Sequence, residues 1–230
     1  MCMSTIADSD IRVDEKREKM AYSTSFWNLI ANHYSKQPIA DQSSYEKKLA
    51  VTQEYFTPES RVLEFGCGTG STALIHAPYV ERYLAIDISA KMLEIAHGKV
   101  EDSEFSKLSN LSFMQTDLHH LNSEDESWDM VMGMSILHLL PDLEQTLQRI
   151  HQLLKPGGVF ISSTICIGDS GMGFKLLAPL FRWMPIMPSV WVFSQQELIT
   201  MMEQVGFEVE YQWCPGTNKA VFIIARKPNP

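Results

Sequence analysis

Hydrophobic and polar positions follow two different periods along this chain. Beyond residue 60, short apolar runs alternate with longer segments whose apolar residues recur every three or four positions, as on one face of a helix. Repetition of strand and helix favours parallel pairing, because a chain that returns to the same edge of a sheet needs a long crossover, usually a helix. We therefore expect an α/β fold, a doubly wound sheet with helices on both faces. The predicted strands are 61–65, 82–86, 111–115, 129–132 and 159–163, with helices at 71–79, 89–100 and 142–154 between them.

The segments on either side of this repeat complete the predicted set of elements. The last two strands are joined by only six residues, so we expect them to pair antiparallel. Asp142 and Ser194 are predicted N-caps, because each side chain can accept from the free N–H groups of a first helical turn. Lys155-Pro156-Gly157-Gly158 is expected to end a helix. The flanking helices are predicted at 25–34, 45–56 and 195–205, and the last strands near 207–213 and 220–225.

The organisation predicted from this pattern is one domain. The length of 230 residues and the 45% hydrophobic content suit a single full-sized core. Residues 1–22 are polar and charged, and we expect a flexible N-terminal segment there. Residues 23–230 form the domain, with an N-terminal helical cap (23–58) and a lid insertion (165–193). Within the lid, residues 176–193 are apolar but contain Arg182 and three prolines, which argues against a transmembrane helix.

Charge and cysteine content narrow the class of protein further. The net charge of −9 disfavours a nucleic-acid partner, because a polyanion is repelled on average. The four cysteines are far apart and do not group with histidines at metal-ligand spacing, so no metal site is predicted. No secretory leader is visible, and we expect a cytoplasmic protein that contacts membranes peripherally at most.

The residues that follow the first three predicted strands are suited to one ligand. Gly66, Gly68 and Gly70 let the backbone turn tightly and approach a ligand closely. Glu64, at the end of the same strand, suits a cationic amino group better than a pyrophosphate. Asp87 ends the next strand, where an acid can accept two ribose hydroxyls. Asp117 ends the third, where it could accept from an adenine amine or cap a helix.

These motifs resemble the class I, Rossmann-like, seven-stranded S-adenosylmethionine-dependent methyltransferases. The resemblance covers about residues 25–227 and is carried by VLEFGCGTG, AIDISAKML, QTDL, WDMVMGMSILHLL and LLKPGGVF. It implies strand order 3-2-1-4-5-7-6 with the last strand antiparallel, and S-adenosylmethionine as cofactor. The cofactor residues it implies, together with those inferred above, are Glu64, Phe65, Gly66, Cys67, Gly68, Gly70, Asp87, Ile88, Met92, Thr116, Asp117, Leu118 and Met134.

The acceptor side is less defined by the sequence. His138 follows the fourth strand and is the candidate catalytic residue, as a base or as a group that positions the acceptor. Trp27, Tyr34, Trp183 and Trp191 are the candidate substrate pocket, because the family builds its lid from these regions. The same aromatic residues could instead cover the sheet edge or form a homodimer contact. Cys67 could be a nucleophile, although a small residue between glycines is more simply a packing choice.

The function favoured by these residues is methyl transfer from S-adenosylmethionine to a small, partly apolar metabolite, with the acceptor in line with the methyl group. A membrane-associated quinone or phospholipid is an alternative acceptor. A nicotinamide-dependent dehydrogenase would need GxGxxG, whereas the third glycine here comes one residue early. A noncatalytic cofactor-binding protein is a further alternative, because a fold does not certify chemistry.

Overall fold

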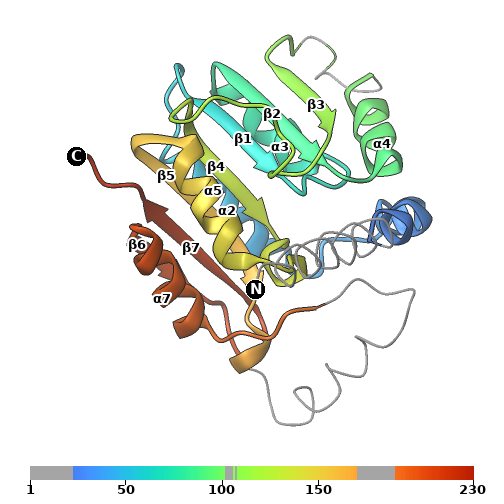
Figure 1. Cartoon of the computed structure of the whole chain (residues 1–230). Helices are drawn as coiled ribbons and strands as arrows, with labels where there is room; N and C mark the ends of the chain where they lie inside the picture. Colours follow the sequence, from blue (N-terminus) through green and yellow to red (C-terminus); the bar gives the residue numbers. More distant parts are fainter. Residues whose placement is uncertain (1–22, 102–105, 107, 170–189) are drawn as a thin grey trace, which may run out of the picture.

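The architecture is a seven-stranded sheet with helices on both faces (Figure 1). It is known from a computed structural model, which describes residues 23–101, 106, 108–169 and 190–230. The strand order is β3-β2-β1-β4-β5-β7-β6, and β7 runs antiparallel to both of its neighbours. The predicted doubly wound fold and its strand order are confirmed. The strands are β1 (Arg61–Phe65), β2 (Arg82–Asp87), β3 (Leu111–Gln115), β4 (Trp128–Met134), β5 (Leu154–Ile165), β6 (Glu208–Trp213) and β7 (Ala220–Arg226).

Two hydrophobic cores lie on the two faces of this sheet, because side chains alternate between faces along each strand. On one face, α5 (Leu143–Leu153) and α7 (Gln195–Val205) cover strand residues such as Leu63 and Phe160. On the other face, α3 (Ser71–His76) and α4 (Ala90–Glu101) cover residues such as Val62 and Ala85. Helix α2 (Gln42–Gln53) packs its Val51 against this second core. Within the described ranges, short 3-10 helices lie at Ala77–Tyr79, Leu137–Leu139 and Ile167–Asp169.

The ends of several elements differ from the prediction. Lys155–Gly158 does not form a free turn after α5, because β5 already begins at Leu154 and Trp128 pairs with that residue. Asp142 occupies the N-cap position of α5 without a side-chain capping hydrogen bond. Ser194 caps α7 as predicted, with a reciprocal pair of hydrogen bonds to Glu197. Helix α2 begins and ends three residues earlier than its apolar spacing indicates, because Asp41 caps it by accepting from the Ser44 N–H.

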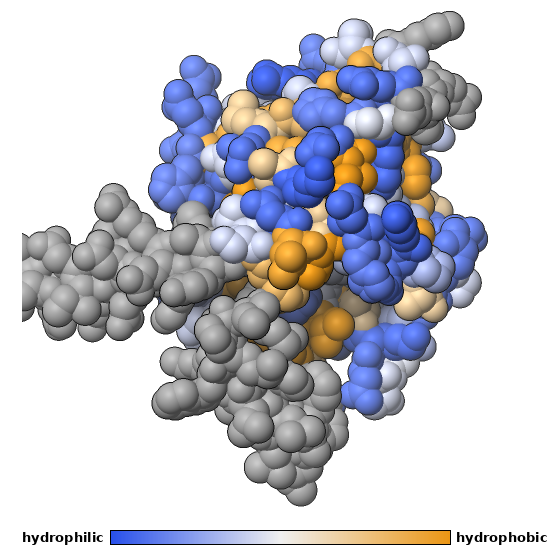
Figure 2. Space-filling view, turned by 90° about the vertical axis from the view of Figure 1, so that its right-hand side faces the viewer, coloured by the Kyte–Doolittle hydropathy of each residue, from blue (hydrophilic) through white to orange (hydrophobic). Residues whose placement is uncertain are grey.

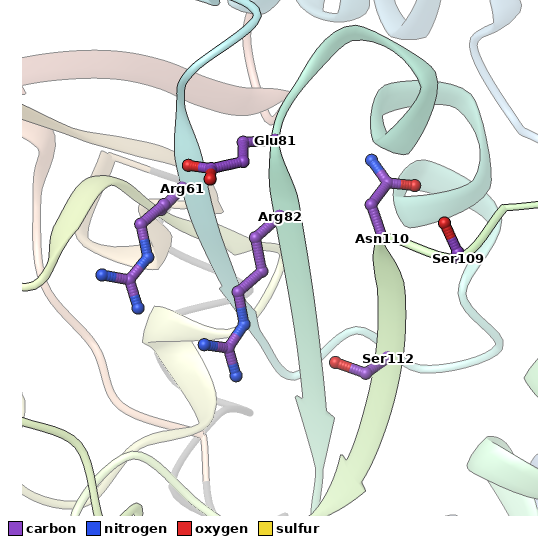
Figure 3. Close-up of a pocket in the computed structure, with 6 residues that line it drawn as sticks. All are labelled: Arg61, Glu81, Arg82, Ser109, Asn110 and Ser112. Carbon is purple, nitrogen blue, oxygen red and sulfur yellow. The ribbon is translucent and has the colours of Figure 1, made fainter.

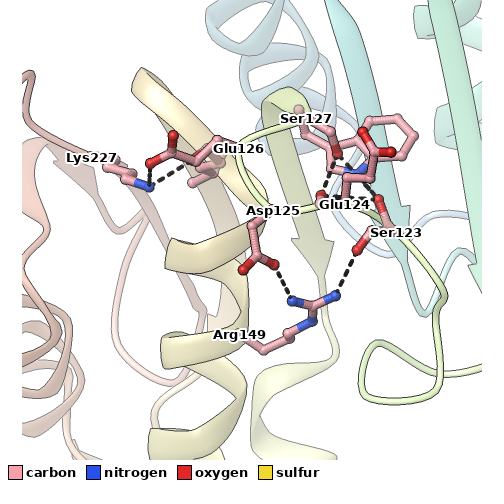
Figure 4. A network of polar contacts seen from close by, with 9 residues as sticks. Ser123, Glu124, Asp125, Glu126, Ser127, Arg149 and Lys227 are labelled. Atoms are coloured by element: carbon pink, nitrogen blue, oxygen red, sulfur yellow. Dashed lines mark hydrogen bonds and ion pairs between the residues drawn. The ribbon is translucent and has the colours of Figure 1, made fainter.

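The connection from β3 to β4, residues 116–127, contains no helix. Hydrogen bonds tie it instead to α5, where Arg149 donates to the Asp125 carboxylate at 2.7 Å and to the Ser123 carbonyl at 3.1 Å (Figure 4). The Ser123 hydroxyl in turn accepts from the indole N–H of Trp128 at 2.9 Å. Trp128, the first residue of β4, is therefore fixed in place. Because no helix follows β3, the face of β3 on the side of α5 is left uncovered by this connection. Ser112 and Met114 of β3 are exposed as a result.

Candidate functional site

A cavity of about 150 Å³ opens at the carboxyl ends of the parallel strands, where the polypeptide leaves β1, β2, β3 and β4. Ligands bind at this edge in open α/β sheets because the strand order reverses there. Most of the residues predicted to bind the cofactor line this one cavity. They are Phe65, Gly66, Gly68, Asp87, Ile88, Met92, Thr116, Asp117, Leu118 and Met134, and Trp27 and Tyr34 line it as well.

The glycine turn after β1 has a backbone that side chains disfavour. Gly66, Gly68 and Gly70 have φ angles of 64°, 55° and 71°, in the left-handed region that glycine tolerates. A Cβ on Gly66 would approach the Ile136 side chain to 2.8 Å, whereas a Cβ on Gly68 would meet only the Tyr34 ring, at 4.0 Å. Gly68 is therefore the position where the backbone faces open space in the cavity. Gly70 instead allows close packing, since a Cβ there would lie 2.9 Å from the Cβ of Ala96.

Asp87 links the end of β2 to this turn. Its Oδ2 accepts from the Gly68 N–H at 2.8 Å, and its Oδ1 accepts from the Ser89 N–H at 2.8 Å. Burial raises the pKa of the carboxyl, and these backbone hydrogen bonds partly offset the shift. A carboxylate offers about four lone-pair sites in total, so two remain for a ligand in the cavity. The turn and the acid are thus held together before any ligand binds.

Glu64 lies behind the turn and outside the cavity lining. It is 2% exposed, and its Oε2 accepts a hydrogen bond of 2.8 Å from the Tyr83 hydroxyl. Burial raises the pKa of Glu64 to about 7, while the bond from Tyr83 opposes the shift and the nearby charge of Asp87 adds to it. Because Glu64 does not line the cavity, its carboxylate is not placed to contact an amino group of a ligand there.

Asp117 lines the cavity but also organises its own turn. Its Oδ1 accepts from the N–H groups of His119 and His120 at 2.8 and 3.0 Å. Its Oδ2 lies 2.7 Å from Nδ1 of His120, with which it forms an ion pair when that ring is protonated. His119 also lines the cavity, and its Nε2 lies 3.3 Å from the Thr146 hydroxyl. A ligand at Asp117 would share the carboxylate with this turn.

The other predicted residues lie outside the cavity lining. Cys67 is buried in the second core, and burial raises the pKa of its thiol well above the usual value, which disfavours a nucleophilic role. His138 lies at the carboxyl end of the sheet, with Nδ1 3.0 Å from the Thr164 hydroxyl, and burial lowers its pKa. Trp191 is partly exposed, and its backbone N–H donates to the backbone carbonyl of His138 at 2.8 Å. Trp183 lies outside the described residues.

Residues 23–34 form a helix that brings aromatic side chains to the cavity. The rings of Trp27 and Tyr34 meet edge to face, with centroids 6.2 Å apart. Asn28 anchors this helix to α4, because its Oδ1 accepts from the Ser89 hydroxyl at 2.7 Å and from the Lys91 N–H at 3.1 Å. Figure 2 views the molecule from the side of β3 and α4, and shows hydrophobic residues exposed near the centre of this face. Exposed hydrophobic residues of this N-terminal region include Leu29 and Ile39.

Sequence reasoning missed several residues that shape the site. Ser135, after β4, has a φ of 60°, and its N–H donates to the Ser163 carbonyl at 2.6 Å. A non-glycine residue in this region marks local strain, which often occurs at functional sites. Lys48 of α2 donates to the Ser163 hydroxyl at 2.8 Å, and burial lowers its pKa. Ser135 is a single polar residue within an apolar stretch, which is a local signal, whereas nothing local signals the contact of Lys48.

Among the described residues, no group of three or more His, Cys, Asp or Glu is placed to hold a metal ion. The helices of those same residues are all too short or too polar to cross a membrane.

Known proteins resemble this chain in both sequence and structure. Residues 62–158 match the sequence model of a family described as a methyltransferase domain. Demethylmenaquinone methyltransferase of Lactiplantibacillus plantarum is 25% identical over 186 residues, which cover 70% of this chain and 76% of that protein. The hybrid PKS-NRPS synthetase mpsA of Macrophomina phaseolina is 28% identical over 124 residues, which cover 52% of this chain but only 3% of that much longer protein.

Solved structures share the fold. The S-adenosylmethionine-dependent methyltransferase from Mesorhizobium loti superimposes with a TM-score of 0.62 at 18% identity, covering 77% of this chain and 95% of that one. At such identity the likeness concerns the fold, and the family match, which runs from β1 to the start of β5 and includes the glycine turn, adds the sequence evidence. Residues 62–158 therefore match a methyltransferase domain, and the chain shares the fold of S-adenosylmethionine-dependent methyltransferases.

Proposed function

We propose that this enzyme binds S-adenosylmethionine in the cavity at the carboxyl ends of β1 to β4 and transfers its methyl group in line to a small, partly apolar metabolite. The observation that carries the proposal is that Gly68, Asp87 and Met92 line one cavity although they come from three different elements. The amino acid part of the cofactor would lie at the glycine turn, and the ribose hydroxyls would donate to Asp87.

The cavity residues fit this cofactor on physical grounds. Gly68 leaves room for backbone contact, since a Cβ there would meet nothing closer than 4.0 Å. Asp87 is fixed by two backbone N–H groups and retains lone pairs for two hydroxyl donors. Ile88, Met92 and Leu118 supply apolar walls for an adenine ring. Thr116 and Asp117 would provide the polar edge next to that ring.

Glu64 would act on the cofactor through its charge and not by contact. When bound, the cofactor supplies a methyl group on a cationic sulfonium, which makes the methyl transferable. Its amino group adds a second positive charge near the turn. Because a nearby positive charge favours the ionised form of a carboxyl, Glu64 would lose its proton on binding. The pKa of about 7 in the free protein places that ionisation within the working pH range.

The acceptor would lie at the far end of the cavity, beside Met134, where the surroundings are largely apolar. Trp27 and the residues directly after β4 also line the cavity, and His138 follows them at the carboxyl end of the sheet. The chain's contribution to the reaction would be to orient the acceptor and exclude water. His138 is the candidate to accept a proton when the acceptor carries one that must leave.

The ends of the proposed lid, residues 165–193, support its description as one insertion. The Gly168 N–H donates to the Phe193 carbonyl at 2.8 Å, so both ends meet beside the sheet. A Cβ on Gly168 would lie 2.5 Å from the Ser194 nitrogen, and this glycine therefore serves close packing. Near the described end of the lid, the backbone N–H of Trp191 donates to the backbone carbonyl of His138. These contacts favour a lid over the acceptor end of the cavity.

Calorimetric titration with S-adenosylmethionine and S-adenosylhomocysteine tests the cofactor site. Asp87→Ala should weaken binding by about tenfold or more, because buried hydroxyl groups would lose a charged acceptor. Asp87→Asn keeps one acceptor oxygen for the backbone and should fall between Asp87→Ala and the parent protein. Glu94→Gln removes an exposed carboxylate of α4 that pairs with Lys91 and serves as the matched control. Absence of binding by the parent protein would end the proposal.

Mass spectrometry can identify the acceptor class. A cell extract incubated with the enzyme and deuteromethyl cofactor should yield a labelled product, and we expect this product to be a small metabolite of intermediate polarity. No labelled species, with the cofactor bound, would favour a noncatalytic binding protein.

A membrane-associated quinone or phospholipid is the second candidate acceptor. Similarity to a demethylmenaquinone methyltransferase over most of both chains favours it. Sedimentation with liposomes distinguishes the two: a quinone or phospholipid methyltransferase should pellet with the vesicles, whereas an enzyme for a freely diffusing metabolite should stay in the supernatant. Sedimentation of the protein alone also tests for a homodimer.

A further inference from the structure

A second cleft, of about 540 Å³, lies at the amino ends of β1, β2 and β3, whereas the cofactor cavity lies at their carboxyl ends (Figure 3). Arg61 and Arg82 are the first residues of β1 and β2, so they mark the amino ends of these strands. Because the β3–β4 connection contains no helix, this part of the sheet face is left open to solvent. The cleft is lined by Arg61, Glu81, Arg82, Ser109, Asn110 and Ser112.

The two arginines are held by a single aromatic ring. The Arg61 guanidinium carbon lies 5.4 Å from the centroid of Trp128, and that of Arg82 lies 5.7 Å from it. Trp128 is almost fully buried, and its indole N–H is bonded to Ser123. The ring is therefore a fixed support that attracts both cations through its π face. Two positive charges are thus positioned next to each other before a ligand binds.

Their charge is not neutralised within the described part of the protein. Among the described residues, neither guanidinium forms an ion pair with a carboxylate, although Arg149, Lys155 and Arg226 each do so. Glu81 lines the cleft, and Figure 3 shows its carboxylate near the start of the Arg61 side chain, while both guanidinium groups are directed away from it. Asp129 on β4 is paired with Lys155. The local excess of positive charge contrasts with the net charge of −9 for the whole chain.

We propose that this cleft binds the phosphoryl group of a small phosphomonoester, at a site separate from the cofactor cavity. A phosphomonoester carries a charge close to −2 at neutral pH and three acceptor oxygens. Two guanidinium groups match that charge and donate pairs of hydrogen bonds to such oxygens. The hydroxyls of Ser109 and Ser112 line the same cleft and provide further donors. The volume leaves room for an organic group beyond the phosphate.

Glycerol 3-phosphate is a suitable probe for this site. Calorimetric titration at constant ionic strength should show saturable binding, and glycerol with matched sodium chloride should give none. Arg61→Gln and Arg82→Gln should each weaken binding by about tenfold, because a charge-assisted donor pair is lost. Lys91→Gln removes an exposed cation on α4, far from the cleft, and should leave the affinity unchanged.

Loss of an arginine could also disturb packing on Trp128, so a second variant is needed. Ser112→Asp leaves both arginines on the ring and places a negative charge in the cleft, which should abolish binding of the probe. All variants should bind S-adenosylmethionine with unchanged affinity, which shows that they fold and that the cofactor site is independent. Equal affinity of Arg82→Gln and the parent protein would overturn the proposal. So would binding to vesicles of phosphatidic acid without binding of glycerol 3-phosphate, since the source would then be a lipid headgroup.

Discussion

The hydroxyl of Tyr83 donates a 2.8 Å hydrogen bond to the carboxylate of Glu64, and both residues are buried in the sheet. They come from neighbouring parallel strands, and both side chains lie on the face covered by α3 and α4. The acid near the end of β1 is therefore part of the buried core. Its protonation state must couple the stability of the fold to pH.

Glu64→Gln should change how stability depends on pH. The pKa of Glu64 is raised from 4.5 to about 7 in the folded protein, so folding favours its protonated form. The corresponding stability is fully present below pH 4.5 and is lost as the pH rises through 7. A neutral glutamine avoids this loss, and the variant should be more stable than the parent at pH 8, by up to roughly 3 kcal/mol. Urea unfolding at pH 5, 6, 7 and 8 measures the difference.

Tyr83→Phe is the matched control for that experiment. It removes the hydrogen bond that stabilises the ionised carboxylate, so the pKa of Glu64 should rise further and the loss of stability with pH should become steeper. The double variant with Glu64→Gln should show little of this dependence. Parallel stability curves for the parent protein and Glu64→Gln between pH 5 and 8 would contradict the assignment.

His76 should produce the opposite dependence. It is completely buried in α3, and burial lowers its pKa from 6.5 to about 4. Because folding favours the neutral ring, its contribution to stability is present above pH 6.5 and is lost as the pH falls towards 4. His76→Leu should therefore lose this acid-induced destabilisation, so its stability relative to the parent should increase as the pH falls from 7 to 4.

The effects of His76 and Glu64 oppose each other between about pH 4.5 and 6.5. The parent protein can thus have a flat stability profile in this window although both groups titrate. The single variants should slope in opposite directions, and the double variant should again be flat. Single variants without any slope would show that neither group is perturbed by the fold.

The positions of the strands and of the glycine turn after β1 were predictable from the sequence. The parallel strands are marked by apolar runs, and the turn after β1 is marked by Gly66 and Gly68, which are local signals. Asp87 was found in the same way, because its distance along the chain from the turn is set by one intervening helix. These features depend on periodicity and on backbone geometry, which a single sequence contains.

Other features depend on contacts between residues far apart in the chain, which a pattern cannot supply. Tyr83 approaches Glu64 only because β1 and β2 pair in a particular register. The Lys155–Gly158 segment has the composition of a turn, but pairing with β4 and bonds to Lys227 draw it into β5. The contact of Lys48 with Ser163 spans 115 positions and carries no sequence signal.

Alanine substitutions in the glycine turn should separate backbone strain from crowding. Gly68→Ala places a side chain at a φ of 55° but in open space, and should cost roughly 1–2 kcal/mol of stability. Gly66→Ala adds a clash with Ile136 at 2.8 Å to a similar strain, so it should destabilise the protein further. Combining it with Ile136→Ala should recover part of the loss, as measured by thermal unfolding.

The two variants should also differ in cofactor affinity. Gly68→Ala fills the space where the backbone meets the ligand, so it should weaken S-adenosylmethionine binding more than its effect on stability suggests. The pair Gly66→Ala and Ile136→Ala should bind the cofactor better than Gly68→Ala does. Equal affinities for the parent protein, Gly68→Ala and the double variant would mean that the cofactor does not approach Gly68.

His138 should control the pH dependence of methyl transfer. Burial lowers its pKa below 6.5, and the Thr164 hydroxyl lies 3.0 Å from Nδ1 and orients the ring. A base acts in its neutral form, so the rate should rise with pH through a midpoint below 6.5 and stay constant above it. The labelled-product assay, run between pH 5 and 8, measures this profile. His138→Gln should lower the rate by about 100-fold and remove the acidic limb, while cofactor affinity stays unchanged.

Thr164 variants distinguish a base from a group that only positions the acceptor. Thr164→Val removes the partner of Nδ1 and keeps the shape of the side chain, so the rate should fall and the midpoint should move. Thr164→Ser retains the hydroxyl and should behave like the parent protein. If His138→Gln lowers the rate but leaves the acidic limb in place, proton transfer must involve another group, and His138 would then act by positioning the acceptor.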